Sequence, residues 1–522
     1  MTLLSKALDR AGFPRVDADA EARKVAVLRI VVGLLLAWRS GLIARDALYY
    51  FDPTLIMGRP WPIEAVAGWI QCALALGLAL GIGARSCAVL LMLTHAAFSV
   101  WTGTYNLGPM LLVPILGALA VLEGGRLTLR AGLRAAPPAA AFRAVYLILF
   151  LAYAGWSFQA VLYHVHDPYW IQGRTTEVMF TNSYLSEFYG VFRAWERASP
   201  GTLRAMSIFV GSAQTLFQMA MIPLIFTRWG RVYVRVWGWI FILGSLFDLQ
   251  LTLLPFVEAV LWAMVFMPAR WFAPRSGRSI SAGGSRHSEE LRVAAAVYTA
   301  GYGALSLLFF TNAILGYTMS RSLPPWIANP VLFYAGLVAP NVFNTTDLMM
   351  GDRWTVLARI DQGQLKLVPF DGFEGERLAY LRSDLLYFAN SLRWRREMIF
   401  AGDLAAYHQP GAPGYAYAYR VALYDHRRRG SLVPETYAVT VFRNYAAERA
   451  GAATATRYAP VQAFAFTLTI GPGSTASRWA TRPDHPLPSP NHPTTGPLQP
   501  FFSGRVIPDR AGNGGVSRWS KL

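Results

Sequence analysis

The sequence predicts an all-α polytopic membrane domain of about nine transmembrane helices, then a small extracytoplasmic α+β domain and a disordered C-terminal tail. Between Val25 and Met319 lie successive apolar stretches, most of them long enough to cross roughly 30 Å of hydrocarbon as helices. Hydrophobic residues make up 54% of the 522 residues and charged residues 15%, fewer charges than the roughly 25% of a soluble domain. Because a backbone inside lipid must satisfy its own hydrogen bonds, these stretches are predicted to be helices.

The predicted spans follow one another with short connections. They cover residues 25–44, 62–83, 86–102, 107–122, 143–163, 205–227, 236–252, 253–268 and 292–318. The seventh and eighth are short, and they form either a tight hairpin or a re-entrant pair closed near Pro255. The total therefore lies between eight and ten spans, and Val331–Phe343, too short to cross, is expected to be an interfacial helix.

The distribution of basic residues predicts the orientation. With a cytoplasmic N-terminus, 18 Lys and Arg residues fall in inner segments and six in outer loops. The outer six are Arg45, Arg59, Arg174, Arg193, Arg197 and Arg204. This bias, with nine spans, predicts a bacterial inner-membrane protein whose C-terminal domain is periplasmic. The net charge of +18 is therefore attributed to topology and to membrane lipid as a partner. Nucleic acid is not expected, because no basic cluster alternates with aromatic residues on a soluble module.

Beyond the spans the composition changes at Asn344, and the pattern becomes mixed. The expected elements are a hairpin over Trp354–Phe370 turning at Gln362-Gly363, helices at Arg382–His408 and Gly414–His426, and strands at Thr436–Asn444 and Pro460–Ile470. The last segment is rich in Pro, Gly and Ser and is predicted to be disordered. The predicted domains are a cytoplasmic segment (1–24), a transmembrane domain (25–343), a periplasmic α+β domain (344–470) and a disordered tail (471–522).

Charged side chains inside predicted spans are costly in lipid, so each is a candidate for a functional role. Arg39, in the first span, either forms a structural ion pair or holds an anionic group of the substrate. The acidic partners available for a pair are Asp46, Asp248 and Glu258. Asp248 and Glu258 are either solvated at the outer interface or act as a general base or proton relay. His95, in the third span, is expected to be a satisfied buried histidine.

The long outer loop, residues 163–204, holds the other candidates. Its His164-Val165-His166-Asp167 run can shuttle protons. No metal is predicted, because His-x-His directs both rings to one side only in an extended backbone and no third ligand is evident. One interpretation is an aromatic belt on the membrane surface that includes Trp170. The other is a site where His164 and His166 transfer protons while Trp170, Arg174 and Arg39 bind substrate.

The sequence lacks the residues or motifs that several types of chemistry require. Lysine occurs only at positions 6, 24, 366 and 521, outside the spans and the outer loop, which excludes a lysine base in a membrane cavity. There is no P-loop, dinucleotide-binding glycine pattern or His-Glu-x-x-His motif, so the cofactor is unassigned. No paired broken helices support secondary transport. The two cysteines, Cys72 and Cys87, are expected to be small buried thiols.

Nine short motifs, taken in their order along the chain, resemble one membrane family. They are Leu28–Leu35 (LRIVVGLL), Asn106-Leu107-Gly108, Arg126–Leu129 (RLTL), Ala154-Gly155-Trp156, Trp170–Gly173 (WIQG), Leu254-Pro255-Phe256, Phe266-Met267-Pro268, Asp352–Val356 (DRWTV) and Ser391–Arg396 (SLRWRR). Together they make residues 25–400 similar to the HTTM (horizontally transferred transmembrane) family, whose relatives include the vitamin K-dependent γ-carboxylases. The resemblance implies an integral membrane fold with a cavity open to the non-cytoplasmic side.

Two departures limit what the resemblance implies. The carboxylases use a lysine as base near the start of the outer loop, whereas Gly155–Tyr163 (GWSFQAVLY) contains none. The histidine often found in the family's late helices is not evident in Ile240–Gln250. Vitamin K-dependent carboxylation is therefore not carried over to this chain.

Two functions are favoured over transport by the sequence. The first is a membrane enzyme acting on a lipid, quinone or lipid-linked substrate from the non-cytoplasmic side. The second is a non-catalytic scaffold or maturation partner that docks another protein at the periplasmic face. Unchanged activity after both His164→Ala and His166→Ala would remove these histidines from any mechanism.

Overall fold

The protein is described here from a computed structural model, which is mostly helical with one small sheet. It describes residues 17–50, 63–102, 107–123, 126–129, 137–164, 170, 172–181, 186, 188–249, 253–272, 290, 293, 296–305, 353–367, 422–423, 425–427, 429–445, 459–471 and 478–480. The predicted helix Arg382–His408 and interfacial helix Val331–Phe343 lie outside these residues.

Helices follow the apolar stretches of the sequence. They are α2 (Ala18–Tyr50), α3 (Ile63–Leu80), α4 (Ala84–Thr102), α5 (Leu107–Leu122), α6 (Ala139–His164), α8 (Arg174–Thr181), α9 (Tyr189–Ala198), α10 (Pro200–Leu224), α11 (Arg228–Phe247), α12 (Leu254–Phe266) and the 3-10 turn η1 (Ala269–Phe272). Residues 296–305 are also helical and fall inside the ninth predicted span. The prediction that these segments are mainly helical is confirmed in their described parts, whereas the number that cross a membrane stays a prediction.

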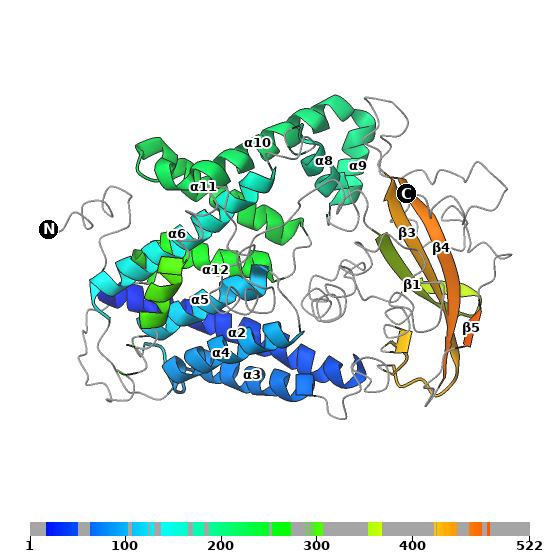
Figure 1. The fold of residues 1–522 in the computed structure, drawn as a ribbon, viewed down its shortest axis with the longest axis horizontal. Helices are drawn as coiled ribbons and strands as arrows, with labels where there is room; N and C mark the ends of the chain where they lie inside the picture. The colour runs from blue at the N-terminus through cyan, green and yellow to red at the C-terminus, as the bar shows by residue number, and fades with distance from the viewer. Residues whose placement is uncertain are drawn as a thin grey trace.

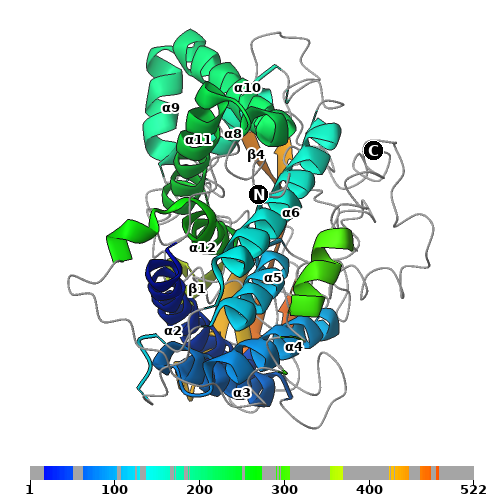
Figure 2. The same ribbon diagram turned by 90° about the vertical axis from the view of Figure 1, so that its left-hand side faces the viewer.

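The helices pack in two connected groups (Figures 1 and 2). In the first group α2 packs on α3, α3 on α4 and α4 on α5. In the second, α10 packs on α6, α8 and α11. Helix α12 joins the groups, because it contacts both α5 and α11. The largest buried hydrophobic cluster runs through both groups.

Helices α2 and α3 approach closely because small residues face each other. A Cβ atom on Gly33 would lie 2.7 Å from the backbone nitrogen of Ala79, and one on Gly68 would lie 2.9 Å from the Cβ of Ala44. Such small-residue contacts let the backbones of neighbouring membrane helices come together. The α2–α3 pair therefore depends on glycine at these positions.

A network of charged and polar contacts joins several helices at one end of the bundle, which we call the inner end. Lys24 Nζ lies 2.6 Å from Glu21 Oε2, and Tyr146 donates to the same oxygen over 2.7 Å. Arg29 Nη1 lies 3.1 Å from Glu123 Oε2. Glu21, Lys24 and Arg29 belong to α2, Tyr146 belongs to α6, and Glu123 directly follows α5. The first turns of α2 and α6 therefore lie next to the end of α5.

Two further contacts place other helix ends at the inner end. Arg85, at the start of α4, donates to the carbonyls of Ala120 and Glu123 at the end of α5. Lys24 Nζ donates to the carbonyl of Met267, just after α12. Lys24 and Arg85 therefore share this end of the bundle, whereas the side of a membrane on which it lies stays a prediction.

Two helices begin seven or eight residues before their predicted spans. Helix α2 begins at Ala18 rather than 25, because Glu21 and Lys24 neutralise each other and are buried. Helix α11 begins at Arg228 rather than 236, where the Thr227 hydroxyl accepts a hydrogen bond from the Gly230 nitrogen. In both places charged residues expected in a connection belong to a helix.

Two helices are long and apolar enough to cross a membrane by length and composition, Ala139–Leu162 within α6 and Pro200–Leu224. Shorter apolar helices are Ala65–Leu80, Ala84–Phe98, Met110–Leu122 and Leu254–Phe266. Both counts refer to the described residues alone. The coarse expectation of an apolar helical domain is therefore confirmed.

The five strands form one antiparallel sheet in the order β2-β1-β3-β4-β5. They are β1 (Arg353–Asp361), β2 (Gln364–Leu367), β3 (Glu435–Tyr445), β4 (Ala459–Ile470) and β5 (Arg478–Ala480). The predicted hairpin turn at Gln362-Gly363 is confirmed, and both residues have positive φ, as a tight primed turn requires. The predicted strands at Thr436–Asn444 and Pro460–Ile470 are confirmed as β3 and β4.

Strand β5 extends the sheet beyond the boundary predicted at residue 470. It pairs with β4 through Leu468 and Trp479, although residues 471–522 were expected to lack structure. An edge strand needs only backbone hydrogen bonds along one side, so the polar composition of this segment does not prevent pairing. The remainder of that segment, and most of Gly414–His426, lie outside the described residues.

Candidate functional site

His164 and Trp170, two predicted site residues, are in direct contact. Their rings stack with centroids 3.8 Å apart and planes 16° apart, and both side chains are buried. The Trp170 Nε1 donates to the hydroxyl of Thr215 on α10 over 3.1 Å. Trp170 therefore lies between the end of α6 and α10, so it does not belong to an exposed aromatic belt.

The segment after Trp170 is anchored on α10 as well. Gly173 has a φ of +70°, and a Cβ there would lie 2.7 Å from the backbone nitrogen of Ile208. Glu177 of α8 is buried and forms an ion pair with Arg204 of α10. The first part of the outer loop is thus packed against the helices, with a glycine required at the close approach.

Asp248 caps the end of α11 and holds a neighbouring segment. Its Oδ1 accepts hydrogen bonds from the Ser186 hydroxyl over 2.5 Å and from the Phe188 nitrogen over 3.2 Å. The next residue, Leu249, forms an isolated antiparallel bridge with Ser186 and packs against Trp170. Asp248 therefore belongs to the same outer region as the His164–Trp170 stack, and it is buried rather than solvated at an interface.

Glu258 lies deeper, in the first half of α12. Its side chain is 1% exposed, and Oε1 accepts a hydrogen bond from Tyr153 of α6 over 2.9 Å. Among the described residues, Oε2 has no hydrogen-bond partner. An incompletely satisfied buried carboxyl group is costly, which makes it a candidate for a function rather than for stability.

Aromatic rings surround the Glu258–Tyr153 pair. The Tyr153 ring contacts Trp262 at 5.7 Å between centroids, and Trp262 in turn contacts Phe217 at 5.9 Å and Phe266 at 4.5 Å. Gly238 of α11 makes room for Trp262, because a Cβ there would lie 2.3 Å from the indole. The pair is therefore enclosed by apolar surroundings that strengthen its electrostatic interactions.

Arg39 is buried on α2, as its position within an apolar stretch predicts. The choice between a structural ion pair and an anion anchor stays a prediction. His95 is buried as expected.

A polar row on α10 was not predicted. Ser207, Gln214 and Gln218 are buried on the face that meets α6 and α11, and Gln214 Oε1 accepts from Trp237 Nε1 over 3.0 Å. Among the described residues, Gln214 Nε2, Gln218 Oε1 and Ser207 Oγ have no hydrogen-bond partner. Their spacing of seven and four residues within an apolar helix was the signal in the sequence.

The structure does not describe the side chains of two predicted site residues. His166 lies outside the described residues, and Arg174 is described only as the first residue of α8. Their predicted roles stay predictions. Within the described part of the chain, no three His, Cys, Asp or Glu side chains gather as they would around a metal ion. Cys72 and Cys87 are free thiols, each half-buried.

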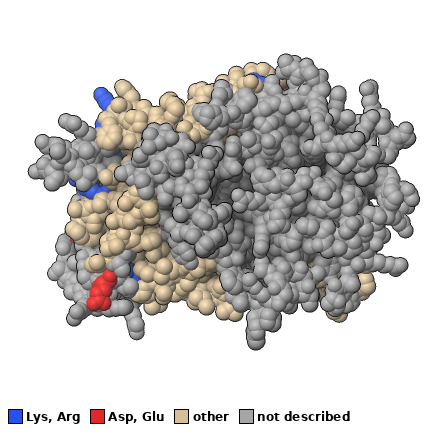
Figure 3. All heavy atoms as spheres, viewed as in Figure 1, with Lys and Arg blue, Asp and Glu red and all other residues tan. Residues whose placement is uncertain are grey.

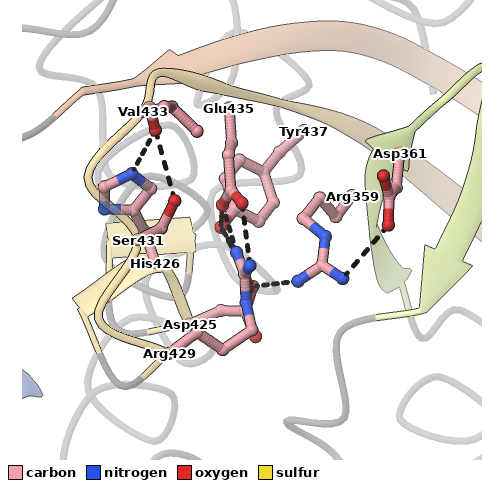
Figure 4. Close-up of polar contacts among 9 residues, drawn as sticks. All are labelled: Arg359, Asp361, Asp425, His426, Arg429, Ser431, Val433, Glu435 and Tyr437. Carbon is pink, nitrogen blue, oxygen red and sulfur yellow. Dashed lines mark hydrogen bonds and ion pairs between the residues drawn. The ribbon is translucent and has the colours of Figure 1, made fainter.

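The sheet carries a separate ion cluster (Figure 4). Arg429 donates to both carboxylate oxygens of Glu435, one of them over 2.8 Å. It also donates to the Tyr437 hydroxyl over 2.9 Å, and that hydroxyl lies 2.9 Å from Asp425 Oδ2. Arg359 of β1 approaches Asp425 at 3.6 Å. The cluster ties the short helical segment around Asp425 to β3 and β1.

Glu435 makes this cluster sensitive to acid. Burial raises the pKa of Glu435, but the hydrogen bonds and charge of Arg429 outweigh burial and lower the pKa from 4.5 to about 2. A carboxyl group with a lowered pKa in the folded state stabilises the fold above its unfolded pKa. This contribution is complete above pH 4.5 and is lost as the pH falls through about 2.

We therefore expect β3 to lose hydrogen-exchange protection as the pH of the full-length protein falls from about 5 to about 2. The measurement is amide exchange of residues 435–445, corrected for the pH dependence of the intrinsic rate. Glu435→Gln should remove most of this dependence. Asp361→Asn, which alters the outer 3.8 Å contact with Arg359, should keep it. An identical pH profile in Glu435→Gln would contradict the assignment.

Comparisons with known proteins add no relative. No protein-family model, curated protein or solved structure matches the chain. The class that the fold defines is therefore the one built above, an apolar helical domain followed by an antiparallel sheet.

Proposed function

We propose that the chain is an integral membrane protein with an HTTM-like arrangement of helices. The support is an extended apolar surface combined with buried charges, the reverse of a soluble bundle. Exposed large hydrophobic residues on the bundle include Val31, Leu34 and Trp38 of α2, Val66, Trp69 and Ile70 of α3, Leu90 and Leu93 of α4, Phe209, Leu216 and Met219 of α10, and Val232, Val236 and Ile240 of α11. On the face in Figure 3, few charged side chains interrupt the described surface.

Within this membrane protein, the proposed activity is acid–base chemistry on a lipid, quinone or lipid-linked substrate from the non-cytoplasmic side. The observation that carries it is the buried Glu258 carboxyl group, held by Tyr153 through one oxygen and without a described partner for the other. Glu258 would exchange a proton with the substrate through Oε2, while Tyr153 fixes its orientation. Positioned acid–base groups of this kind typically contribute about 10²–10⁴-fold to rate.

The test compares two tyrosines of α6 that each donate to a buried glutamate. Tyr153 bonds Glu258, and Tyr146 bonds Glu21 at the inner end. The variants are expressed in cells from which the gene for this protein has been deleted. The Glu258→Gln variant should fail to restore the normal phenotype although it is expressed at the level of the wild-type protein. Tyr153→Phe should weaken rescue, and Tyr146→Phe should affect only thermal stability. Full rescue by Glu258→Gln would overturn the enzymatic proposal.

The outer region favours the second candidate, a non-catalytic scaffold or maturation partner. Here His164 is stacked on Trp170, and Asp248 is bonded to Ser186 and Phe188. These contacts build a packed platform at the end of the bundle. If a partner protein docks there, His164→Ala should lower its recovery with the purified protein, whereas Glu258→Gln should not. Mass spectrometry of lipids and quinones that co-purify in mild detergent addresses the first candidate directly.

A further inference from the structure

Helix α9 presents an apolar stripe to the outside. Phe188, Val191 and Trp195 are exposed and spaced by three and four residues, so they share one side of the helix. Val191 is 64% exposed. Next to the stripe, Phe192 stacks on Phe180 of α8 with ring centroids 4.6 Å apart, and on Trp195 with centroids 6.5 Å apart. This stack anchors α9 and leaves the stripe pointing away from the protein.

The stripe continues onto α10, one of the two helices able to cross a membrane. Trp195 Nε1 donates to the hydroxyl of Thr202 over 2.7 Å. Thr202 begins the exposed row of α10, which continues with Ala205, Phe209, Ser212, Leu216 and Met219. Since this row is the surface assigned to lipid above, the α9 stripe is continuous with it.

The direction of α9 suits a position in the plane of the bilayer. The chain turns sharply at Ser199 and Pro200, and Figure 1 shows α9 running across the end of α10 rather than along it. If α10 crosses the bilayer, α9 lies close to parallel to its surface. Tryptophan is enriched at that depth, because its ring is apolar while its N–H group is polar.

We propose that α9 lies in the interface of the non-cytoplasmic leaflet, with Phe188, Val191 and Trp195 inserted among the first carbons of the acyl chains. This inference rests on the proposed membrane placement of the chain. The partner is the lipid surface, which an amphipathic helix binds through its buried apolar area. Phe188 and Trp195 lie in the loop for which an aromatic belt was considered from the sequence, whereas Trp170 is packed inside the protein.

The experiment uses the full chain with Cys72→Ala and Cys87→Ala, reconstituted in phosphatidylcholine–phosphatidylglycerol vesicles. A fluorescent NBD group is attached to Val191→Cys, and its quenching by shallow doxyl-labelled lipid and by aqueous iodide is measured. Gly190→Cys is the matched control, because it is exposed on another side and a Cβ there meets no atom within 4 Å. Leu216→Cys, in the middle of α10, reports on membrane crossing.

Doxyl lipid should lower the emission of the Val191 probe roughly twofold or more relative to the Gly190 probe, and iodide should show the reverse order. Equal accessibility of both probes to iodide, with Leu216 quenched by deep doxyl lipid, overturns the α9 inference but keeps the membrane placement. Strong iodide quenching at Leu216 overturns both. If Val191→Cys does not fold, Ala198→Cys replaces it, since Ala198 is also exposed next to the stripe.

Discussion

Replacing Gly33 with valine should force α2 and α3 apart and lower the free energy of unfolding by about 3 kcal/mol. Even the first atom of the new side chain would lie 2.7 Å from the Ala79 nitrogen and 2.8 Å from the Ala75 carbonyl oxygen. Both atoms belong to a helix backbone, so they cannot move aside as a flexible side chain would. The measurement is the midpoint of thermal aggregation in detergent, which should fall by several degrees.

The matched control is Gly41→Ala on the same helix. A Cβ at this position would lie 3.6 Å from the Cys72 sulfur, an ordinary van der Waals contact. Alanine also favours the helix over glycine by about 1 kcal/mol, so the variant should be as stable as the wild type or more stable. Similar losses in Gly33→Val and Gly41→Ala would show that α2 and α3 do not pack as described.

The sequence predicts well those helices and turns that are determined by neighbouring residues. Apolar runs long enough for a helix identify α3 to α6, and Pro255 marks the start of α12, where it lies in the first turn. The turn at Gln362-Gly363 is likewise determined by residues that accept positive φ. In each case the information lies within a few neighbouring residues.

The sequence does not predict features that depend on contacts between residues far apart in the chain. Glu21 and Lys24 look like a polar segment before a span, and their burial depends on Tyr146 and Met267, far along the chain. The candidate site shows the same limit. His164 and Trp170 were both identified, but their stack depends on Thr215 of α10, which no local pattern connects to them.

Replacing Arg29 with methionine should destabilise the helical domain by about 3–5 kcal/mol, because the buried Glu123 carboxylate would lose the guanidinium group that lies against it. The Arg29 side chain is fully buried, with Nη1 3.1 Å from Glu123 Oε2 and Nη2 2.7 Å from the Leu127 carbonyl. The double variant Arg29→Met, Glu123→Leu should recover most of this loss, since removing both charges is often nearly neutral. A double-mutant cycle of unfolding in SDS measures the coupling.

The pair Arg126–Asp19 supplies the comparison, because it lies at the same inner end with Asp19 partly exposed at 39%. Arg126→Met should cost about 1 kcal/mol or less, as expected for a pair that water and salt screen. Additive losses for Arg29 and Glu123, or equal costs for Arg29→Met and Arg126→Met, would contradict the burial described. A large difference between the two pairs would show that the charges are withdrawn from water within about three helical turns of α2. The inner end can therefore lie where a bilayer meets the aqueous phase without exposing an unpaired charge to lipid.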